Sequence, residues 1–314
     1  MTRSSSEERV LSAKDTAPVV ERRAPRTPRQ APTARGFSPL RVLGMGFVWL
    51  FTALNIVVLY WLIAAAFKTP IEIFNKPFAL PQQWIARGEP FRNFIYAWNN
   101  AGFGRAFVVT VLLVAVSAVV IVLVSAPAAY ALTRLGVRGT NGLTNFIAIG
   151  MGIPFQTVVI PLFIGMAKLD LTNNLFGMFL IYVALSIPFT VFLMTGFFKS
   201  LPDELEEAAA IDGASPSRTF FSIMLPLAKG GLITALIINA IGLWNETLLA
   251  IVFLNENANF TLARALFSFY GAASYQSEYG GLIAGVAIVV LPMLVLYILL
   301  ARRIITGLTL GAGK

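Results

Sequence analysis

The stretch that decides the fold reads LPDELEEAAAIDGASP over residues 201–216 and forms a polar island between two long apolar runs. Ser200 and Asp203 have the spacing of a capping box, with Pro202 in the first turn. Gly213 stands where a C-terminal cap belongs. The pattern therefore predicts a helix over about 201–212.

Ser215 and Pro216 repeat the start signal directly after that glycine. They predict a second short helix that contains Phe220 and Phe221 and ends at Pro226. The polar island is thus expected to fold as helix, tight turn, helix.

Like charges recur on the first of these helices. Asp203 and Glu207 lie four residues apart, a spacing at which carboxylates repel by about 0.2–0.5 kcal/mol. A position near the helix start offsets part of this cost. Because the helix contains no Lys or Arg, the sequence predicts that another molecule supplies a basic surface to it.

The composition is that of an integral membrane protein. Of the 314 residues, 57% are hydrophobic and 12% are charged, with a mean hydropathy of +0.76, whereas soluble domains carry about 25% charged residues. Cys and His are absent, which excludes disulfides and thiolate nucleophiles and argues against a zinc or haem site, so we predict no catalytic residues and no metal ligands. The net charge of +9 lies largely in the N-terminal segment and beside apolar runs, which favours an orientation signal over nucleic-acid binding.

Six apolar runs approach or exceed the roughly 20 residues that a helix needs to cross a bilayer. They predict an all-α membrane protein with six transmembrane helices and a cytoplasmic helix-turn-helix between the fourth and the fifth. Residues 1–43, rich in Arg, Pro, Ser and Thr, are expected to form a disordered basic tail. We place the spans at about 44–66, 106–132, 143–166, 175–198, 230–254 and 280–301.

The distribution of Lys and Arg predicts the orientation. With the N-terminal tail inside, the inner segments hold 17 of these residues and the outer segments hold 7. The positive-inside rule then places both termini and the acidic helix pair in the cytoplasm.

The polar island also matches a known motif. Glu207-Ala208-Ala209, three residues, Gly213, nine residues and Ile223-Met224-Leu225-Pro226 resembles the EAA loop of the membrane-spanning subunits of ABC importers. Together with the six-span layout, the chain resembles the maltose-type carbohydrate permeases of binding-protein-dependent ABC importers over about 44–314. Further pieces of this resemblance are Ala128 to Leu132 with Arg134 before Gly139, Pro188-Phe189, Trp244-Asn245-Glu246 and Gly307 to Gly311.

The resemblance implies a heteromeric importer in the bacterial cytoplasmic membrane. Its other parts would be a sister permease, two ATP-binding subunits that carry ATP and Mg, and an extracytoplasmic solute-binding protein. This chain would bind no cofactor, would have no ATPase site and would transport a carbohydrate by alternating access. The ATPase would dock on residues of a coupling loop, 199–229, namely Glu206, Glu207, Ala208, Ala209, Asp212, Gly213 and Ala214.

The fifth predicted span contains candidate residues of a translocation path: Asn239, Trp244, Asn245 and Glu246. A carboxylate inside a bilayer is costly enough to face a cavity or a partner. Asn239 and Glu246 share one helix face, and Trp244 could stack on a sugar ring. Hydrogen bonding between helices remains an alternative for each of the four.

Other functions remain open at this point. An importer permease for phosphate, polyamines or amino acids would share the motif. A stand-alone secondary transporter is disfavoured because the spans lack the buried charged residues that proton coupling usually needs. A membrane-embedded enzyme would need a nucleophile and base that the sequence does not show.

Overall fold

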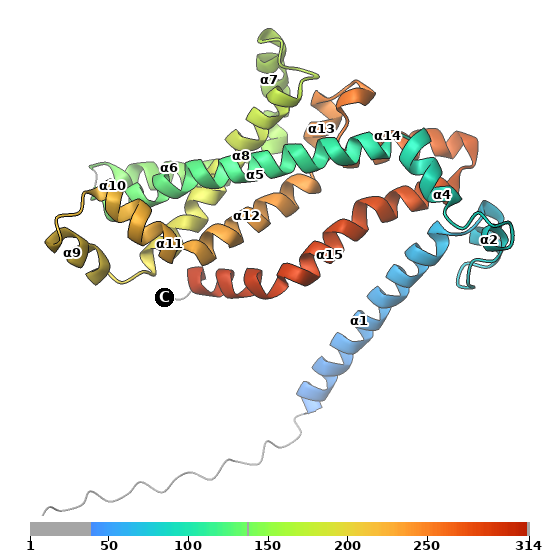
Figure 1. Ribbon diagram of the computed structural model, residues 1–314, viewed down its shortest axis with the longest axis horizontal. Coiled ribbons are helices and arrows are strands. Elements are labelled where there is room, and N and C mark those ends of the chain that lie inside the picture. Colours follow the sequence, from blue (N-terminus) through green and yellow to red (C-terminus); the bar gives the residue numbers. More distant parts are fainter. Residues whose placement is uncertain (1–38, 137, 313–314) are drawn as a thin grey trace, which may run out of the picture. The chain divides into compact units, whose positions relative to one another are not determined.

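The computed structural model describes residues 39–136 and 138–312. Every regular element in these ranges is a helix, which confirms the predicted all-α class (Figure 1). The chain divides into two compact units, residues 1–53 and 54–314. Most of the predicted tail lies outside the described residues, and its last part, from Pro39, is helical.

Helix α1 (Pro39–Ala66) begins in the first unit. All of its residues up to Ala53 are exposed, including Leu43 and Trp49. An apolar helical segment without buried positions, such as Pro39 to Ala53, suits a lipid environment.

The second unit is built on long apolar helices. Helices α5 (Phe103–Arg134) and α8 (Leu175–Lys199) pack against each other, and α15 (Tyr279–Ala312) packs on α12 (Lys229–Trp244). With α1, the helices α5, α8 and α15 are each long and apolar enough to cross a membrane. Two bent helix pairs raise the number of possible spans to six in the described chain.

The predicted third and fifth runs are both interrupted. The run 143–166 consists of α6 (Thr140–Met151) and α7 (Phe155–Lys168), which meet at 95°, and α7 projects from the other helices (Figure 1). Pro154 interrupts the helix because a proline disfavours helical backbone at the preceding residue and has no backbone N–H to donate. In the run 230–254, α12 ends at Trp244 and α13 (Leu248–Phe253) follows after three residues.

Short helices fill the segment between α1 and α5. They are α2 (Pro70–Asn75), α3 (Gln83–Ala86), α4 (Arg92–Ile95) and the π-helix η1 (Tyr96–Asn100). Glu72 is buried there, and its carboxylate accepts hydrogen bonds from the backbone N–H groups of Thr69, Gln82 and Gln83 at 3.1, 2.9 and 3.0 Å. Burial by itself raises the pKa of this carboxyl, but the hydrogen bonds outweigh burial and hold the pKa below its usual value.

A further helix that the hydropathy pattern does not predict follows α13. The short 3₁₀ turn η3 (Asn257–Asn259) leads into α14 (Leu262–Gln276), whose start is capped by Thr261. Thr110 of α5 accepts a hydrogen bond from the Leu262 N–H at 2.7 Å, so the beginning of α14 is held against α5.

Candidate functional site

The first helix of the coupling loop starts later than its sequence suggests. Helix α9 spans Glu204–Ile211, and the predicted capping box between Ser200 and Asp203 does not form. Ser200 follows the end of α8, where its hydroxyl donates to the Phe197 carbonyl at 2.7 Å. The Asp203 carboxylate is bound to Arg134 instead. Both residues therefore have partners other than the free N–H groups of α9.

The turn after α9 is as predicted. Gly213 has φ +71°, the left-handed conformation that an L side chain rarely adopts. The Ala214 N–H donates to the Ala209 carbonyl at 2.9 Å, and the Gly213 N–H donates to the Ala210 carbonyl at 3.0 Å. These bonds satisfy the last carbonyls of the helix.

The second helix starts at the predicted cap and continues beyond its predicted end. The Ser215 hydroxyl accepts from the Arg218 N–H at 3.3 Å, and Pro216 is the first residue of α10 (Pro216–Thr219). The π-helix η2 (Phe220–Met224) and α11 (Leu225–Leu227) follow. The helical segment ends at Leu227, one residue beyond the predicted end at Pro226. This proline lies in the first turn of α11, where its missing N–H costs nothing.

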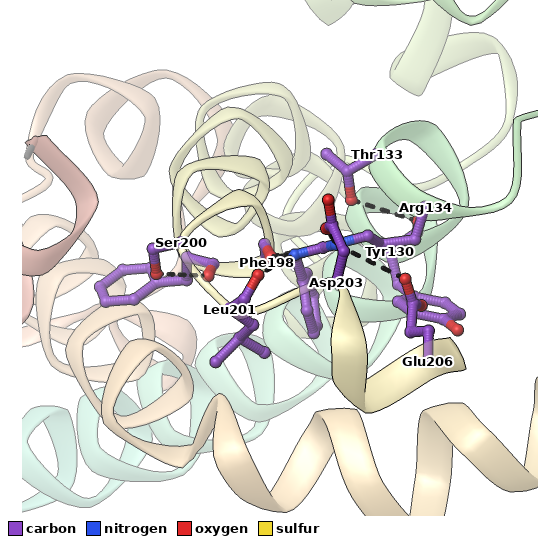
Figure 2. A network of polar contacts seen from close by, with 9 residues as sticks. Tyr130, Thr133, Arg134, Phe198, Ser200, Leu201, Asp203 and Glu206 are labelled. Atoms are coloured by element: carbon purple, nitrogen blue, oxygen red, sulfur yellow. Dashed lines mark hydrogen bonds and ion pairs between the residues drawn. The ribbon is translucent and has the colours of Figure 1, made fainter. Parts of the chain in front are cut away.

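The cation opposite the acidic helix belongs to this chain. Arg134, the last residue of α5, has a side chain that is only 7% exposed. Figure 2 shows its guanidinium between the end of α8 and the start of α9. It forms ion pairs with Asp203 and, at 3.5 Å, with Glu206. The prediction that another molecule neutralises this helix is therefore wrong for Asp203.

The same guanidinium also binds the backbone. Nε and Nη2 donate to the Phe198 carbonyl at 3.2 and 2.6 Å, and Nη2 donates to the Leu201 carbonyl as well (Figure 2). These carbonyls lie at the C-terminal end of α8, where the helix dipole favours a positive charge. Sequence reasoning placed Arg134 in a family motif but did not identify these contacts.

Helix α9 presents two faces. Ala209 is buried and Glu206 is partly buried, so these two predicted residues face the rest of the chain. Ile211, which the sequence analysis did not single out, is 87% exposed. Of the other predicted coupling residues, Ala214 is partly buried. The remaining ones are exposed: Glu207, Ala208, Asp212 and Gly213.

An apolar core joins α5 and α8 to η2, which is part of the coupling loop. The rings of Tyr130, Phe198 and Phe220 have centroids 5.0–6.2 Å apart. Met224 of η2 is fully buried in the same cluster. The second half of the loop is thus part of the folded core.

Two of the predicted path residues hydrogen-bond to neighbouring helices. The buried Asn239 amide donates to the Thr190 hydroxyl at 2.9 Å and to the Ala235 carbonyl at 2.8 Å. The Trp244 indole N–H donates to the Val289 carbonyl of α15 at 3.2 Å. The bonds to Thr190 and Val289 are the interhelical bonds that the alternative interpretation expected, whereas the bond to Ala235 lies within α12.

The other two path residues lie at the break after α12. The Asn245 amide is exposed and donates to the Ile241 carbonyl at 2.8 Å. The Glu246 carboxylate accepts from the N–H groups of Leu249 and Ala250 at 2.6 and 3.1 Å. It also accepts from the Tyr182 hydroxyl at 3.2 Å. Glu246 thereby satisfies the free N–H groups at the start of α13.

Glu246 also lines a cavity of about 590 Å³. The cavity lies between the α6–α7 break, the middle of α8 and the end of α12. Its polar side chains are Glu246, Tyr182, Gln156 and Ser186, and the remaining lining is mainly apolar and aromatic. Among the residues that the structure describes, no cluster of three or more carboxylates is placed to hold a metal ion.

Comparison with known proteins identifies the family. A model of the family described as "Binding-protein-dependent transport system inner membrane component" matches residues 121–306. The chain belongs to this family. The part of the chain that the family model matches includes Arg134, the coupling loop and all four path candidates. Helices α1 to α4 lie outside the matched part.

Individual relatives support the same assignment. The chain is 33% identical to the diacetylchitobiose uptake system permease protein NgcG of Streptomyces coelicolor, covering 84% of this chain and 86% of the relative. It is 32% identical to the multiple sugar-binding transport system permease protein MsmG of Streptococcus mutans, covering 80% and 88%. It is 34% identical to the melibiose/raffinose/stachyose import permease protein MelC of Bacillus subtilis, covering 74% and 84%.

A solved structure shares the fold. It is a bacterial ABC transporter involved in the import of the acidic polysaccharide alginate, with a TM-score of 0.71 and 23% identity. The similarity covers 84% of this chain and 95% of that one. The resemblance to importer permeases is thus confirmed, and this family member is a multi-pass inner-membrane protein.

Proposed function

We propose that the chain is a permease subunit of an ATP-driven ABC importer that moves a sugar or oligosaccharide across the cytoplasmic membrane. A sister permease, two ATP-binding subunits and an extracytoplasmic solute-binding protein complete the importer. ATP and Mg are bound by the ATP-binding subunits, and this chain contributes no ATPase site. Both of its termini face the cytoplasm.

The carbohydrate class is supported by the relatives, which are named for diacetylchitobiose, multiple sugars and melibiose, raffinose or stachyose. The cavity beside Glu246 has suitable chemistry, because ligand pockets combine apolar and aromatic walls with a few polar groups. Aromatic side chains and hydroxyl, amide and carboxylate groups together match the apolar faces and the hydroxyl groups of a sugar.

The observation that carries the coupling proposal is the outer face of α9. Ile211 is 87% exposed beside the exposed carboxylates of Glu207 and Asp212. Burying a side chain of this size is worth about 1.5–3 kcal/mol. An exposed apolar residue with a charged rim is the arrangement found at the centre of protein interfaces. We assign this face to the ATP-binding subunit.

The two interrupted helices support a transport path. Non-helical backbone at membrane depth is tolerated where it is buried in protein or lines a cavity. The break at 152–154 and the break at 245–247 both contribute to the 590 Å³ cavity. Discontinuous helices of this kind form substrate sites in other transporters. Rigid-body movement of the permease pair would open this cavity to either side.

The test uses the complete importer in vesicles. ATP is placed inside and labelled sugars outside, or, in vesicles of the opposite orientation, ATP is placed outside and labelled sugars inside. Glu207→Gln and Ile211→Ser are expected to reduce both binding of the ATP-binding subunits and ATP-driven uptake. Asp170→Asn, a change from exposed acid to amide far from the coupling loop in sequence, serves as the control. Unchanged assembly and uptake in both loop variants would refute the coupling role. Uptake of phosphate, polyamines or amino acids in place of sugars would refute the substrate class.

A further inference from the structure

The two halves of the coupling loop are attached to the molecule in different ways. The second half, α10 to α11, buries Thr219, Phe220 and Met224 in the core. In the first half, α9, Ala209 is the one fully buried residue among those that the structure describes. An alanine contributes one methyl group to packing. The partly buried Leu205 also packs against the core around Phe198 and Met224. Ala209 and Leu205 together give α9 a smaller apolar contact than the second half of the loop has.

Arg134 adds a polar attachment to this small apolar contact. Its side chain extends from the last residue of α5 and binds the Phe198 and Leu201 carbonyls at the end of α8. It also binds the carboxylates of Asp203 and Glu206 at the start of α9 (Figure 2). One guanidinium thus joins the end of α5 to the end of α8 and the start of α9, which follow α5 more than 60 residues later in the chain.

The geometry requires arginine rather than any cation. The contacts use Nε, Nη1 and Nη2 in different directions, which a planar guanidinium with five donors provides. A lysine ammonium would keep the charge but could not reach both carbonyls and both carboxylates from one point. The Arg134 side chain is 7% exposed and that of Glu206 is 24% exposed, whereas that of Asp203 is 82% exposed. Burial therefore shields the bonds to the carbonyls and to Glu206 from water and competing ions more than it shields the ion pair with Asp203.

We propose that Arg134 is the positioning residue that makes α9 move together with α5 and α8, so that displacement of the docked ATP-binding subunit reaches the spans. This inference rests on the proposed function. Arg134 itself touches neither the ATP-binding subunit nor the transported sugar. Without it, the outer face of α9 still binds the ATPase, but the bound helix shifts without carrying α5 and α8 with it.

The test measures ATP hydrolysis and sugar uptake in the same vesicles and compares the sugar transported per ATP hydrolysed. Arg134→Gln is expected to retain the ATP-binding subunits and to lower this ratio by about 5- to 150-fold, the range of typical coupling free energies. Arg134→Lys is expected to recover only part of the ratio. The exposed Arg138 gives the matched control, Arg138→Gln, which should leave the ratio unchanged.

A cross-link tests whether attachment is what Arg134 provides. The chain contains no cysteine, so Arg134→Cys and Asp203→Cys can be combined and joined by a short bifunctional thiol reagent. The double variant should be uncoupled before cross-linking and regain coupling afterwards. A ratio that stays low after complete cross-linking would contradict the proposal.

Two other outcomes would also overturn it. An unchanged ratio in Arg134→Gln would show that α9 is held without this residue. Loss of the ATP-binding subunits in proportion to lost uptake would show that Arg134 only shapes the docking face. Glu207→Gln, measured in parallel, separates the docking role of the outer face of α9 from the attachment role of Arg134. If Glu207→Gln lowers uptake while Arg134→Gln transports as much sugar per ATP as the parent protein, only the attachment role is refuted.

Discussion

Replacing Gly231 by alanine is expected to destabilise the joint between α8 and α12, whereas the same change at the adjacent Gly230 is not. A Cβ atom at position 231 would lie 2.7 and 2.8 Å from Cδ1 and Cδ2 of Phe197, and nearer still to Cγ. At position 230 it would meet nothing within 4 Å. Carbon atoms prefer a separation of about 3.5–4.0 Å, so the overlap at 231 is about 1 Å.

The size of the effect follows from the comparison of the two variants. Overpacking a core costs about 1–3 kcal/mol. Alanine also favours a helix over glycine by at most about 1 kcal/mol. Because both positions lie in the first turn of α12, this gain is nearly the same in each variant and cancels. Gly231→Ala should therefore be less stable than Gly230→Ala by about 1–3 kcal/mol.

The measurement is the heat-induced unfolding midpoint of the purified importer in detergent, followed by loss of the monodisperse complex. In a domain of 150–250 residues, 1 kcal/mol corresponds to about 2–4 °C. In a Phe197→Ala background the ring is absent, so Gly231→Ala should then behave like Gly230→Ala. Equal midpoints for the two single variants, or a clash that persists without the ring, would refute this account.

Three further predictions concern single side chains. Gly213→Ala forces an L residue into the left-handed region and should cost about 1–2 kcal/mol of unfolding free energy, while Gly213→Asn should cost less; equal midpoints would contradict the turn geometry. Ser215→Ala removes the acceptor for the Arg218 N–H and should cost about 0.5–2 kcal/mol, most of which Ser215→Asp should restore; a loss of the same size in Ser215→Asp would argue against the cap. The lowered pKa of Glu72 means that its carboxylate stabilises the folded state above the ordinary value of 4.5, and that this stability is lost as the pH falls from there through the lowered pKa. Unfolding midpoints of Glu72→Gln should therefore vary less with pH below 4.5 than those of the parent protein, and parallel curves would contradict this.

Local turn chemistry was predictable from the sequence. The left-handed Gly213 and the Ser215 cap depend on residues within five positions of one another, so a local sequence pattern is enough to predict them. The helical class and the apolar runs were predictable for the same reason, because composition and run length are properties of single segments.

Contacts between distant segments were not predictable. Arg134 and Asp203 are 69 positions apart, and no local rule connects them. The false capping box illustrates the consequence: Ser200 and Asp203 have the right spacing, but the Phe197 carbonyl and Arg134 compete for their side chains. Tertiary partners displaced a local pattern.

Hydropathy also concealed the helix breaks. Residues 152–154 and 245–247 interrupt runs that remain apolar on average, so run length and composition in the sequence do not show the interruptions. Pro154 was a visible signal for the first break. At the second break, Glu246 was visible as a charge, but its bonds to the Leu249 and Ala250 N–H groups follow only from the interruption itself.

The π-helix η2 gives a structural meaning to the number of residues between the glycine turn and Ile223. Its wider turn holds more residues per revolution than an α-helix, and it begins at Phe220 inside that interval and ends at Met224, directly after Ile223. Deleting one residue would let the segment close into ordinary turns and rotate everything after it by about 100° around the axis. Phe220 and Met224 could then no longer both enter the core while Pro226 kept its place in the first turn of α11. The length of this interval is therefore fixed by backbone geometry, independently of which side chains occupy it.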